Sequence, residues 1–330
     1  MSQPLATRVA LMRLLESGDW RSGAVLAAQL GVTRAAVWKQ IRGLAAWGVP
    51  ITTQRGLGYR LCEPLALLDV PRLRDLLGPI AADPGVEVFD SLPSTNAYLV
   101  SRIAAGQGAG VCLAEHQTAG RGRRGRAWHS PFGRNLYLSV SHAFDAGPAQ
   151  LAGLSLAIGT ALVQLLRGLG VAGLGIKWPN DLVCGQRKLG GILIELQGDT
   201  HGPCWAVVGI GLDVNMSATE GSAIDQPWTS LARVTGRPWD RTALAAQVIR
   251  TVRDAMTMFP ATGLAPWLAA YADADVLAGR EIDVEWAGER LRGVARGIDV
   301  NGALLVDCDG ERRPLWGGEV TVRAGHGSAA

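Results

Sequence analysis

The chain has 330 residues, of which 18% are charged and 48% are hydrophobic, and its formal net charge is +3 at pH 7. This composition excludes a disordered, charge-driven chain and suits a compact protein of about two domains at the usual ~150 residues each. Of the 32 basic residues 29 are Arg, and only Lys39, Lys177 and Lys188 are Lys. Each Lys is therefore a candidate for a compact ammonium that the planar guanidinium of Arg cannot replace.

The charge is unevenly distributed along the chain. Residues 1–62 hold eight basic and two acidic side chains, a net charge of +6, so the rest of the chain carries −3. A basic N-terminal segment on an acidic body indicates that a polyanion would bind to the first 62 residues. The five cysteines are scattered and form no C-x-x-C pair, so we expect reduced, structural cysteines in a cytoplasmic protein. The longest apolar run, 151–163, is shorter than the ~20 residues of a membrane helix and predicts a buried core helix and no membrane partner.

The first 63 residues predict a winged helix-turn-helix domain. Apolar spacing predicts helices over 5–15, 22–30 and 34–47, with Gly31 in the turn and Thr33 as the cap of the third. Residues 51–61 follow with the pattern of a hairpin, which would form the wing. In this geometry the third helix enters the major groove and basic side chains bind phosphates, so we predict operator DNA as a partner. The alternative is a packing module that binds no DNA. The side chains expected at the DNA are Ser22, Thr33, Arg34, Trp38, Lys39, Arg42 and Arg55.

The rest of the chain predicts two further domains and a tail. Residues 64–273 alternate β-rich and helical patterns, which indicates a central mixed α/β domain. Residues 274–324 contain five short strand patterns separated by turns, which indicates a small SH3-like β-barrel. Residues 325–330 read as a tail. The expected fold class is therefore an α+β multidomain protein.

An Arg-rich segment, 120–126, is the best phosphate-binding candidate. It holds four Arg and three Gly between two predicted strands. Glycine lets backbone amides approach an anion, and Arg offers paired donors to phosphate or carboxylate. The sequence contains no glycine-rich loop ending in Lys-Ser or Lys-Thr that would compete for this role. The alternative is a solvated basic loop without a ligand.

A second group, 177–195, holds two of the three lysines. Lys188 precedes a Gly-Gly pair and a strand pattern, which places an ammonium where a carboxylate or α-phosphate could lie. Asn180 offers an amide that can read a base edge, and Asp181 offers a carboxylate that can hold Mg²⁺. The alternative is an ordinary hairpin with a surface lysine, and the scarcity of lysine argues against it.

A third group lies at the start of a predicted helix. Ser94, Thr95 and Asn96 follow Pro93, and one of them is explained as a helix cap. Three adjacent short polar side chains also form a donor cluster for a polar head such as a urea, to which Gln117 could add.

These motifs together resemble those of the biotin protein ligases. The order is the same for 94–96, 117–128, 177–181, 187–191 and 208–215. With the predicted winged helix, the resemblance covers almost the whole chain and is to the bifunctional members, which are both ligase and repressor of biotin synthesis. The Arg-rich loop combined with Lys-Trp-Pro-Asn-Asp carries the resemblance, since either alone would be weaker.

The resemblance implies a two-step reaction with ATP, Mg²⁺ and biotin. Biotin's carboxylate attacks the α-phosphorus of ATP to form biotinyl-5′-adenylate, and a lysine of the biotin carboxyl carrier protein of acetyl-CoA carboxylase then attacks the anhydride. It also implies a homodimer promoted by the adenylate.

The site residues follow from the same resemblance. Lys188 and Arg123 are implied as catalytic. The implied biotin contacts are Ser94, Thr95, Asn96, Gln117, Gly120, Arg121, Gly122, Arg123 and Lys188. The implied ATP or adenylate contacts are Arg121, Arg124, Arg126, Trp128, Lys177, Asn180, Asp181 and Trp228. Trp228 resembles the aromatic residue of a loop that closes over the adenine, and Mg²⁺ would be held mainly by phosphates, with Asp181 as the candidate protein ligand.

Two alternatives remain at this point. A lipoate ligase has a similar fold and forms an analogous adenylate, but the winged helix and the Arg-rich loop argue against it. An adenylate-sensing transcription factor without turnover would show the same site and bind without catalysis.

Overall fold

The computed structural model describes residues 3–44, 47, 49–81, 85–198, 202–286, 288–317 and 319–322. The chain divides into two compact units, which are described separately. Unit 1 comprises Met1–Ser139, Gly211–Gln226 and Ser230–Ala246, and unit 2 comprises Val140–Ile210, Pro227–Thr229 and Gln247–Ala330. The predicted tail, 325–330, and the end of the predicted barrel domain lie outside the described residues.

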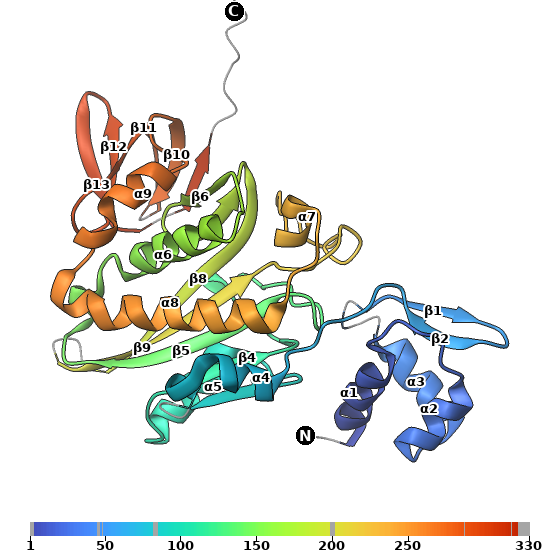
Figure 1. The fold of residues 1–330 in the computed structure, drawn as a ribbon. Helices are drawn as coiled ribbons and strands as arrows, with labels where there is room; N and C mark the ends of the chain where they lie inside the picture. The colour runs from blue at the N-terminus through green and yellow to red at the C-terminus, as the bar shows by residue number, and fades with distance from the viewer. Residues whose placement is uncertain are drawn as a thin grey trace, which may run out of the picture. The chain divides into compact units, whose positions relative to one another are not determined.

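Unit 1 begins with a three-helix domain and a two-stranded wing (Figure 1). The elements are α1 (Gln3–Leu15), α2 (Gly23–Leu30), α3 (Arg34–Leu44), β1 (Ile51–Gln54) and β2 (Gly58–Leu61). The strands β1 and β2 are antiparallel. The Ser22 side chain caps α2, and Gly31 ends it with φ 63°, a left-handed conformation that glycine adopts without strain. The predicted winged helix-turn-helix is confirmed; α3 is described up to Leu44, and residues 45 and 46 of the predicted helix lie outside the described residues.

The inner face of α3 is buried, and Trp47 completes the core of this domain. Val37 and Leu44 are fully buried. The Trp47 ring stacks on His116 and on Phe132, with centroid separations of 5.0 and 5.3 Å. Both partners lie beyond the winged helix in sequence, so the core of this domain is closed by later residues of unit 1.

A buried ion pair organises the segments that follow the winged helix. The Arg241 Nη2 atom lies 2.7 Å from Glu115 Oε2, and both side chains are almost fully buried. Glu115 Oε1 also accepts the Leu68 amide at 2.5 Å. Arg241 donates to the carbonyl oxygens of Ala66 and Asn135. Four chain segments are thereby tied to one pair of charges, which supplies partners to backbone groups that burial would otherwise leave unpaired.

The remaining elements of unit 1 match the predicted alternation. They are α4 (Val70–Leu77), β3 (Val86–Phe89), α5 (Thr95–Ala104), β4 (Val111–Ala114), the turn η3 (Arg123–Gly125), the start of β5 (Leu136–Phe144) and α7 (Leu231–Thr235). The strands β3 and β4 are parallel, with α5 between them along the chain. The carboxyl ends of β3 and β4 therefore lie at one edge, from which residues 91–96 and 115–120 continue.

Unit 2 contains the rest of the large sheet and its covering helices. The strands are β6 (Leu174–Lys177), β7 (Asp181–Cys184), β8 (Arg187–Gly198) and β9 (Cys204–Leu212), whose last two residues belong to unit 1. The helices are α6 (Leu154–Gly168), α8 (Arg241–Thr262), whose first six residues belong to unit 1, and α9 (Leu268–Ala274). The order of the seven strands is β3-β4-β5-β9-β8-β7-β6. The antiparallel strands β6, β7 and β8 lie side by side, and α6 packs on them (Figure 1).

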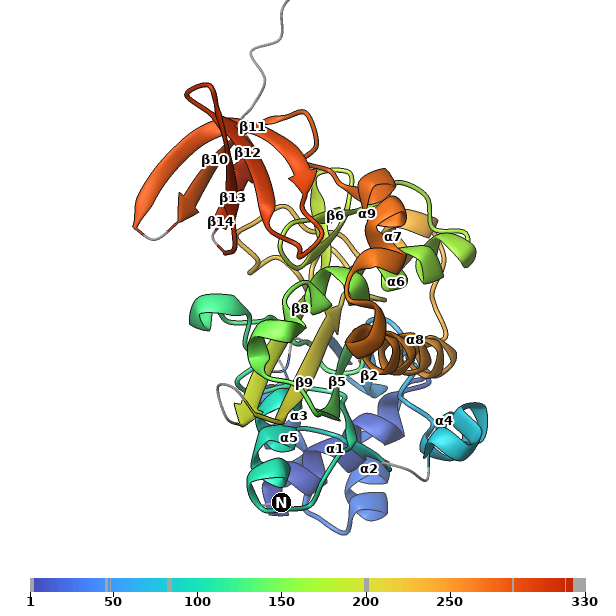
Figure 2. The same ribbon diagram turned by 90° about the vertical axis from the view of Figure 1, so that its left-hand side faces the viewer.

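The C-terminal part of unit 2 is a curved antiparallel sheet (Figure 2). Its strands are β10 (Glu281–Trp286), β11 (Glu289–Ile298), β12 (Leu304–Cys308), β13 (Glu311–Leu315) and β14 (Glu319–Val322). Their order is β13-β12-β11-β10-β14. Ile282, Val284, Leu304 and Val306 are buried, which gives the alternation of a sheet with one packed face. Each of the five predicted strands is present.

The apolar run that the sequence places in the core forms most of α6. By length and composition alone the 21-residue helical stretch Pro148–Gly168 could cross a membrane. The apolar helical stretch is therefore longer than the run of residues 151–163 on which the prediction was based. Ala157, Ile158 and Val163 are nevertheless buried within the structure. This burial is typical of the core helix of a folded domain, and one such helix is weak evidence for a membrane span.

The burial of His116 against Trp47 predicts that the stability of the fold depends on pH. Burial, with smaller contributions from Arg8 and His129, lowers the pKa of His116 from 6.5 to about 4. The unfolded chain takes up this proton near pH 6.5, whereas the folded chain does so only near pH 4. The free energy of unfolding should therefore fall as the pH is lowered from 6.5 to 4, by at most about 1.4 kcal/mol per pH unit.

The measurement is chemical unfolding of the chain and of the His116→Phe variant across this range. The phenylalanine keeps a ring against Trp47 but cannot titrate, so the variant should lose less stability on acidification. Identical pH slopes for the two proteins would contradict the prediction.

Candidate active site and DNA-binding face

The predicted polar cluster of unit 1 is assembled at the start of α5. The Ser94 side chain accepts the Ala97 amide and caps the helix. The Thr95 amide donates to Gln117 Oε1 at 2.9 Å, which brings the end of β4 to the helix start. Thr95 and Asn96 are both buried. Capping thus explains Ser94, while Thr95, Asn96 and Gln117 converge as an uncharged polar group.

Two serines of this cluster are missed by sequence reasoning. Ser139 Oγ, on β5, lies 2.7 Å from Thr95 Oγ1 and 2.6 Å from Asn96 Oδ1. Ser130 Oγ accepts from Gln117 Nε2 at 3.4 Å. The available signal was the polar Ser139 between the apolar Leu138 and Val140, since a fully buried hydroxyl needs a partner.

The Arg-rich segment forms a tight hairpin instead of an irregular loop. The Gly122 amide donates to the Arg126 carbonyl at 2.7 Å, and the Trp128 amide donates to the Gly120 carbonyl at 2.9 Å. Arg124, at the tip, has φ 54°. Arg124 and Arg126 are exposed and Arg123 is half-buried. The hairpin therefore presents several guanidinium groups on a short, hydrogen-bonded backbone.

Two glycines allow Trp128 to close this hairpin. A Cβ atom on Gly120 would lie 2.9 Å from the Trp128 carbonyl oxygen, and one on Gly211 would lie 2.5 Å from Trp128 Cε2. Real Cβ atoms essentially never make contacts this short. The end of the Arg-rich hairpin thus packs directly against the backbone at Gly211.

Unit 2 brings together Lys188, Asp181 and Trp228. Lys188 Nζ lies 2.8 Å from Asp181 Oδ1, with both side chains partly buried. The Lys188 amide donates to the Pro227 carbonyl and the Thr229 amide donates to the Lys188 carbonyl, so Trp228 is paired directly with Lys188. The scarce ammonium and the aromatic residue, 40 positions apart in the sequence, are held in register by backbone hydrogen bonds.

Two residues of the Lys-Trp-Pro-Asn-Asp segment, Trp178 and Asn180, make hydrogen bonds that stabilise the fold, which the sequence did not predict. Trp178 is buried and its indole donates to the Gly302 carbonyl at 3.0 Å. Asn180 Nδ2 donates to the Ile192 carbonyl at 2.8 Å, so this amide donor stabilises the turn between β6 and β7. Lys177 pairs with Asp181 across the hairpin and is half-buried.

The donors at Asp181 fit a Mg²⁺ ion held mainly by substrate phosphates. Within the described residues, no group of three or more His, Cys, Asp or Glu side chains could hold a metal ion. Asp181 supplies one carboxylate, which already neutralises Lys188. One protein oxygen beside a phosphate is a normal arrangement for Mg²⁺, which keeps several waters and binds few carboxylates.

The predicted DNA-binding side chains lie on α3, the wing and the helix caps. Arg34, Lys39, Arg42 and Arg55 are exposed. Trp38 is 52% exposed, and the Arg42 guanidinium lies over its ring at 4.8 Å. The remaining two predicted residues, Ser22 and Thr33, cap α2 and α3. The Trp38 indole and the Arg42 guanidinium are therefore both accessible on the outer face of α3.

Comparison with known proteins matches all three parts of the chain to family models. The biotin/lipoate A/B protein ligase family matches residues 88–215, an HTH domain matches residues 7–60, and the biotin protein ligase C-terminal domain matches residues 278–323. The bifunctional ligase/repressor BirA of Escherichia coli is 42% identical over 95% of this chain and 96% of its own length. The chain belongs to the biotin protein ligase family.

Other biotin protein ligases support the same assignment. The biotin–[acetyl-CoA-carboxylase] ligase of Mycobacterium tuberculosis is 35% identical over 77% of this chain and 95% of its own length. The structure of the Aquifex aeolicus biotin protein ligase in complex with biotin and ATP covers 73% of this chain and 99% of its own, with a TM-score of 0.62 and 24% identity. The last match supports the fold alone.

Within the biotin protein ligase fold, the predicted site residues fall into two sets. Unit 1 holds the polar cluster around Thr95 and the hairpin of residues 120–128. Unit 2 holds the group around Lys188. The structure shows contacts among the residues named above within each set, and the roles of the individual residues stay predictions.

The contact between Gly211 and Trp128 predicts the effect of a single added methyl group. Gly211→Ala should displace Trp128 and with it the Arg-rich hairpin, since overpacking a tight contact costs about 1–3 kcal/mol. We expect adenylate formation, measured as pyrophosphate release with biotin and MgATP, to slow by about tenfold. Gly168→Ala is the matched control, because a Cβ atom there meets nothing within 4 Å. Equal rates in the two variants would show that Trp128 does not position the hairpin.

Proposed function

We propose that this chain is an ATP-dependent biotin protein ligase that also represses transcription from an operator. It forms biotinyl-5′-adenylate and transfers biotin to a lysine of the biotin carboxyl carrier protein of acetyl-CoA carboxylase. The observation that carries the proposal is 42% identity to a bifunctional ligase/repressor over almost the full length of both chains, including the winged helix. The winged helix also favours biotin over lipoate as the substrate class, although one family model covers both ligases.

The chemistry requires fixed positive charge and exclusion of water. In the first step the biotin carboxylate oxygen bonds to the α-phosphorus and pyrophosphate leaves; in the second, a lysine amine bonds to the acyl carbon and AMP leaves. Both steps develop negative charge on phosphate and carboxyl oxygens, which preorganised cations stabilise. Bound Mg²⁺ would neutralise charge on the phosphates, with Asp181 as the residue to hold it. No side chain of the enzyme needs to act as a nucleophile.

Each unit contributes groups suited to part of this work. In unit 1, the neutral cluster of Thr95, Asn96 and Gln117 suits the polar ring of biotin, and Arg121 and Arg123 suit its carboxylate and the adenylate phosphate. In unit 2, the Lys188 ammonium, placed by two backbone hydrogen bonds beside Trp228, suits the oxygens of the reacting groups. Trp228 itself offers an aromatic face for adenine.

Mass spectrometry of a carrier domain, after incubation with the protein, biotin and MgATP, tests the function directly. We expect one biotin to be attached to the carrier, and no transfer by folded protein would overturn the proposal. Adenylate formation without transfer would instead indicate a sensor without turnover.

The Lys188→Arg variant tests the role of the ammonium. A guanidinium is larger and planar and spreads its charge over three nitrogens, so it does not reproduce the compact charge that Lys188 Nζ places 2.8 Å from Asp181 Oδ1. We expect adenylate formation to slow by at least about a hundredfold, the loss typical of one charge-stabilising donor. Near-normal adenylation would refute the argument from lysine scarcity. Arg187→Lys, the reverse exchange at the adjacent exposed position, is the control and should keep the normal rate.

We further propose that the adenylate promotes a homodimer, which binds two operator half-sites. A winged helix reads one half-site, so a dimer would bind with the summed contacts of two. Sedimentation of the protein with and without biotinyl-5′-adenylate measures this step.

DNA binding should depend on Trp38 and Arg55 in different ways. On an operator selected from random DNA by the purified protein, Trp38→Ala should weaken specific binding by about tenfold or more, since each good base contact contributes ~1–3 kcal/mol. Arg55→Ala should weaken specific and non-specific binding alike and reduce the salt slope by about 0.9. Arg292→Ala, an exposed arginine of the C-terminal sheet, is the charge-matched control. Unchanged affinity of both winged-helix variants would place the DNA elsewhere.

A further inference from the structure

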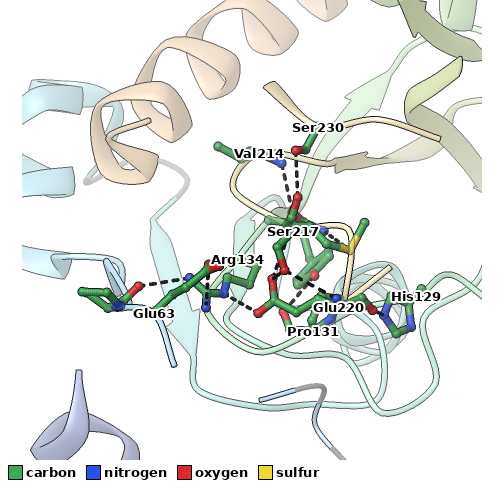
Figure 3. Close-up of polar contacts among 12 residues, drawn as sticks. Glu63, His129, Pro131, Arg134, Val214, Ser217, Glu220 and Ser230 are labelled. Atoms are coloured by element: carbon green, nitrogen blue, oxygen red, sulfur yellow. Dashed lines mark hydrogen bonds and ion pairs between the residues drawn. The ribbon is translucent and has the colours of Figure 1, made fainter. Parts of the chain in front are cut away.

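Arg134 lies at a junction of three chain segments in unit 1 (Figure 3). Its Nε atom donates to Glu220 Oε1 at 2.6 Å, its Nη1 atom donates to the Pro64 carbonyl at 3.0 Å, and its Nη2 atom lies 3.5 Å from Glu63 Oε2. The side chains of Arg134 and Glu220 are 6% and 2% exposed. The first segment is the linker, residues 62–69 between β2 and α4, the second is the stretch before β5, and the third is the stretch between β9 and α7.

Residues 213–230, between β9 and α7, form what we name the closing loop, because they lead to Trp228. The outer part of this loop, 217–229, is largely open to water: Ser222, Ala223, Asp225 and Gln226 are exposed. The two charged side chains of this outer part differ, since Asp225 is exposed and Glu220 is buried. Glu220 is therefore the charged anchor of the outer part of the loop.

Every acceptor of Glu220 is in use. Oε2 accepts the Ser217 amide and hydroxyl, both at 2.9 Å, which tightens the turn of the loop. The backbone carbonyl of Glu220 accepts His129 Nε2 at 2.8 Å. Since His129 directly follows Trp128, one residue of the closing loop is attached both to Arg134 and to the end of the Arg-rich hairpin.

A buried ion pair is a costly way to stabilise a fold. Apolar residues of the same volume often give equal or greater stability, whereas the ion pair selects one geometry. The Arg134 guanidinium is held by the linker and donates to the carboxylate of Glu220 in the closing loop. It therefore fixes the position of the loop more than it stabilises the fold. The place that needs such positioning is a loop that must cover a water-sensitive anhydride.

We propose that Arg134 is a positioning residue for the closing loop, acting through Glu220 to hold the loop over the adenylate and keep water from it. This inference rests on the proposed ligase function. Without the contact, water adds to the acyl carbon of the anhydride and the bond from that carbon to the phosphate oxygen breaks. Biotin and AMP then leave, and the protons of the water go to solvent. ATP is consumed and no biotin reaches the carrier.

The test compares pyrophosphate released with biotin transferred to a carrier domain by the full-length protein. The unaltered protein should release close to one pyrophosphate for each biotin transferred. Arg134→Met and Glu220→Gln should lose preformed adenylate about tenfold faster, the change expected for one charge-assisted hydrogen bond. Their ratio of pyrophosphate to transferred biotin should rise above one, while the initial rate of adenylate formation changes less.

Arg134→Lys and Arg241→Lys separate positioning from folding. Arg134→Lys keeps the positive charge, although on a single nitrogen. We therefore expect this variant to lose preformed adenylate more slowly than Arg134→Met does, but faster than the unaltered protein. Arg241 is at least as buried but bonds to Ala66, Glu115 and Asn135, so Arg241→Lys should lower the unfolding temperature and leave the ratio near one.

The outcomes distinguish this inference from the proposed function. A protein that forms no adenylate fails the proposed function before Arg134 is tested. A ratio of one in folded Arg134→Met and Glu220→Gln, with normal adenylate lifetime, overturns the positioning role while the ligase function stands. A raised ratio in Arg241→Lys equal to that in Arg134→Met would reduce the effect to general destabilisation and also overturn it.

Discussion

The buried pair of Glu115 and Arg241 is the interaction on which unit 1 depends. It joins the end of β4, the start of α8, the linker at Ala66 and Leu68, and the carbonyl before β5. Each charge is desolvated, and breaking such a pair from one side leaves an uncompensated buried charge that costs about 3–5 kcal/mol. The pair therefore fixes how these four segments pack against one another in the core of unit 1.

The chemistry of the family explains why cations of two kinds are separated in the chain. The arginines of residues 121–126 lie on a hydrogen-bonded hairpin, and their planar guanidinium groups offer paired donors suited to carboxylate or phosphate oxygens. Lys188 lies near the start of β8, where its backbone amide and carbonyl bond to the residues on either side of Trp228. Lys188 is one of only three lysines in the sequence, and it lies beside Asp181, the only carboxylate of the Lys-Trp-Pro-Asn-Asp motif. The Lys188 ammonium and the Asp181 carboxylate form an ion pair at 2.8 Å.

Sequence reasoning succeeded where the signal is local and failed where it is not. The cap at Thr33, a cap among residues 94–96 and the five C-terminal strands depend on neighbouring residues, and each was predicted. The short helices α4, α7 and α9 have too few turns for a clear period. The ion pair between Arg134 and Glu220 joins residues 86 positions apart, and the bond from Arg241 to Asn135 spans 106. No periodicity or motif connects such partners, so only the fold reveals them.

The closing loop is tied at its base as well as at Glu220. The Leu231 amide donates to the Asp213 carbonyl, the Ala232 amide donates to the Val214 carbonyl, and Ser230 Oγ donates to the Met216 carbonyl. Because hydrogen bonds hold the two ends of the loop together, its outer part can unfold locally while the rest of the fold remains intact. On the proposal above, the residence time of a bound intermediate depends on the closing loop and on its anchor at Arg134. Natural variation in the exposed loop residues can lengthen or shorten it without any cost to the stability of the domain.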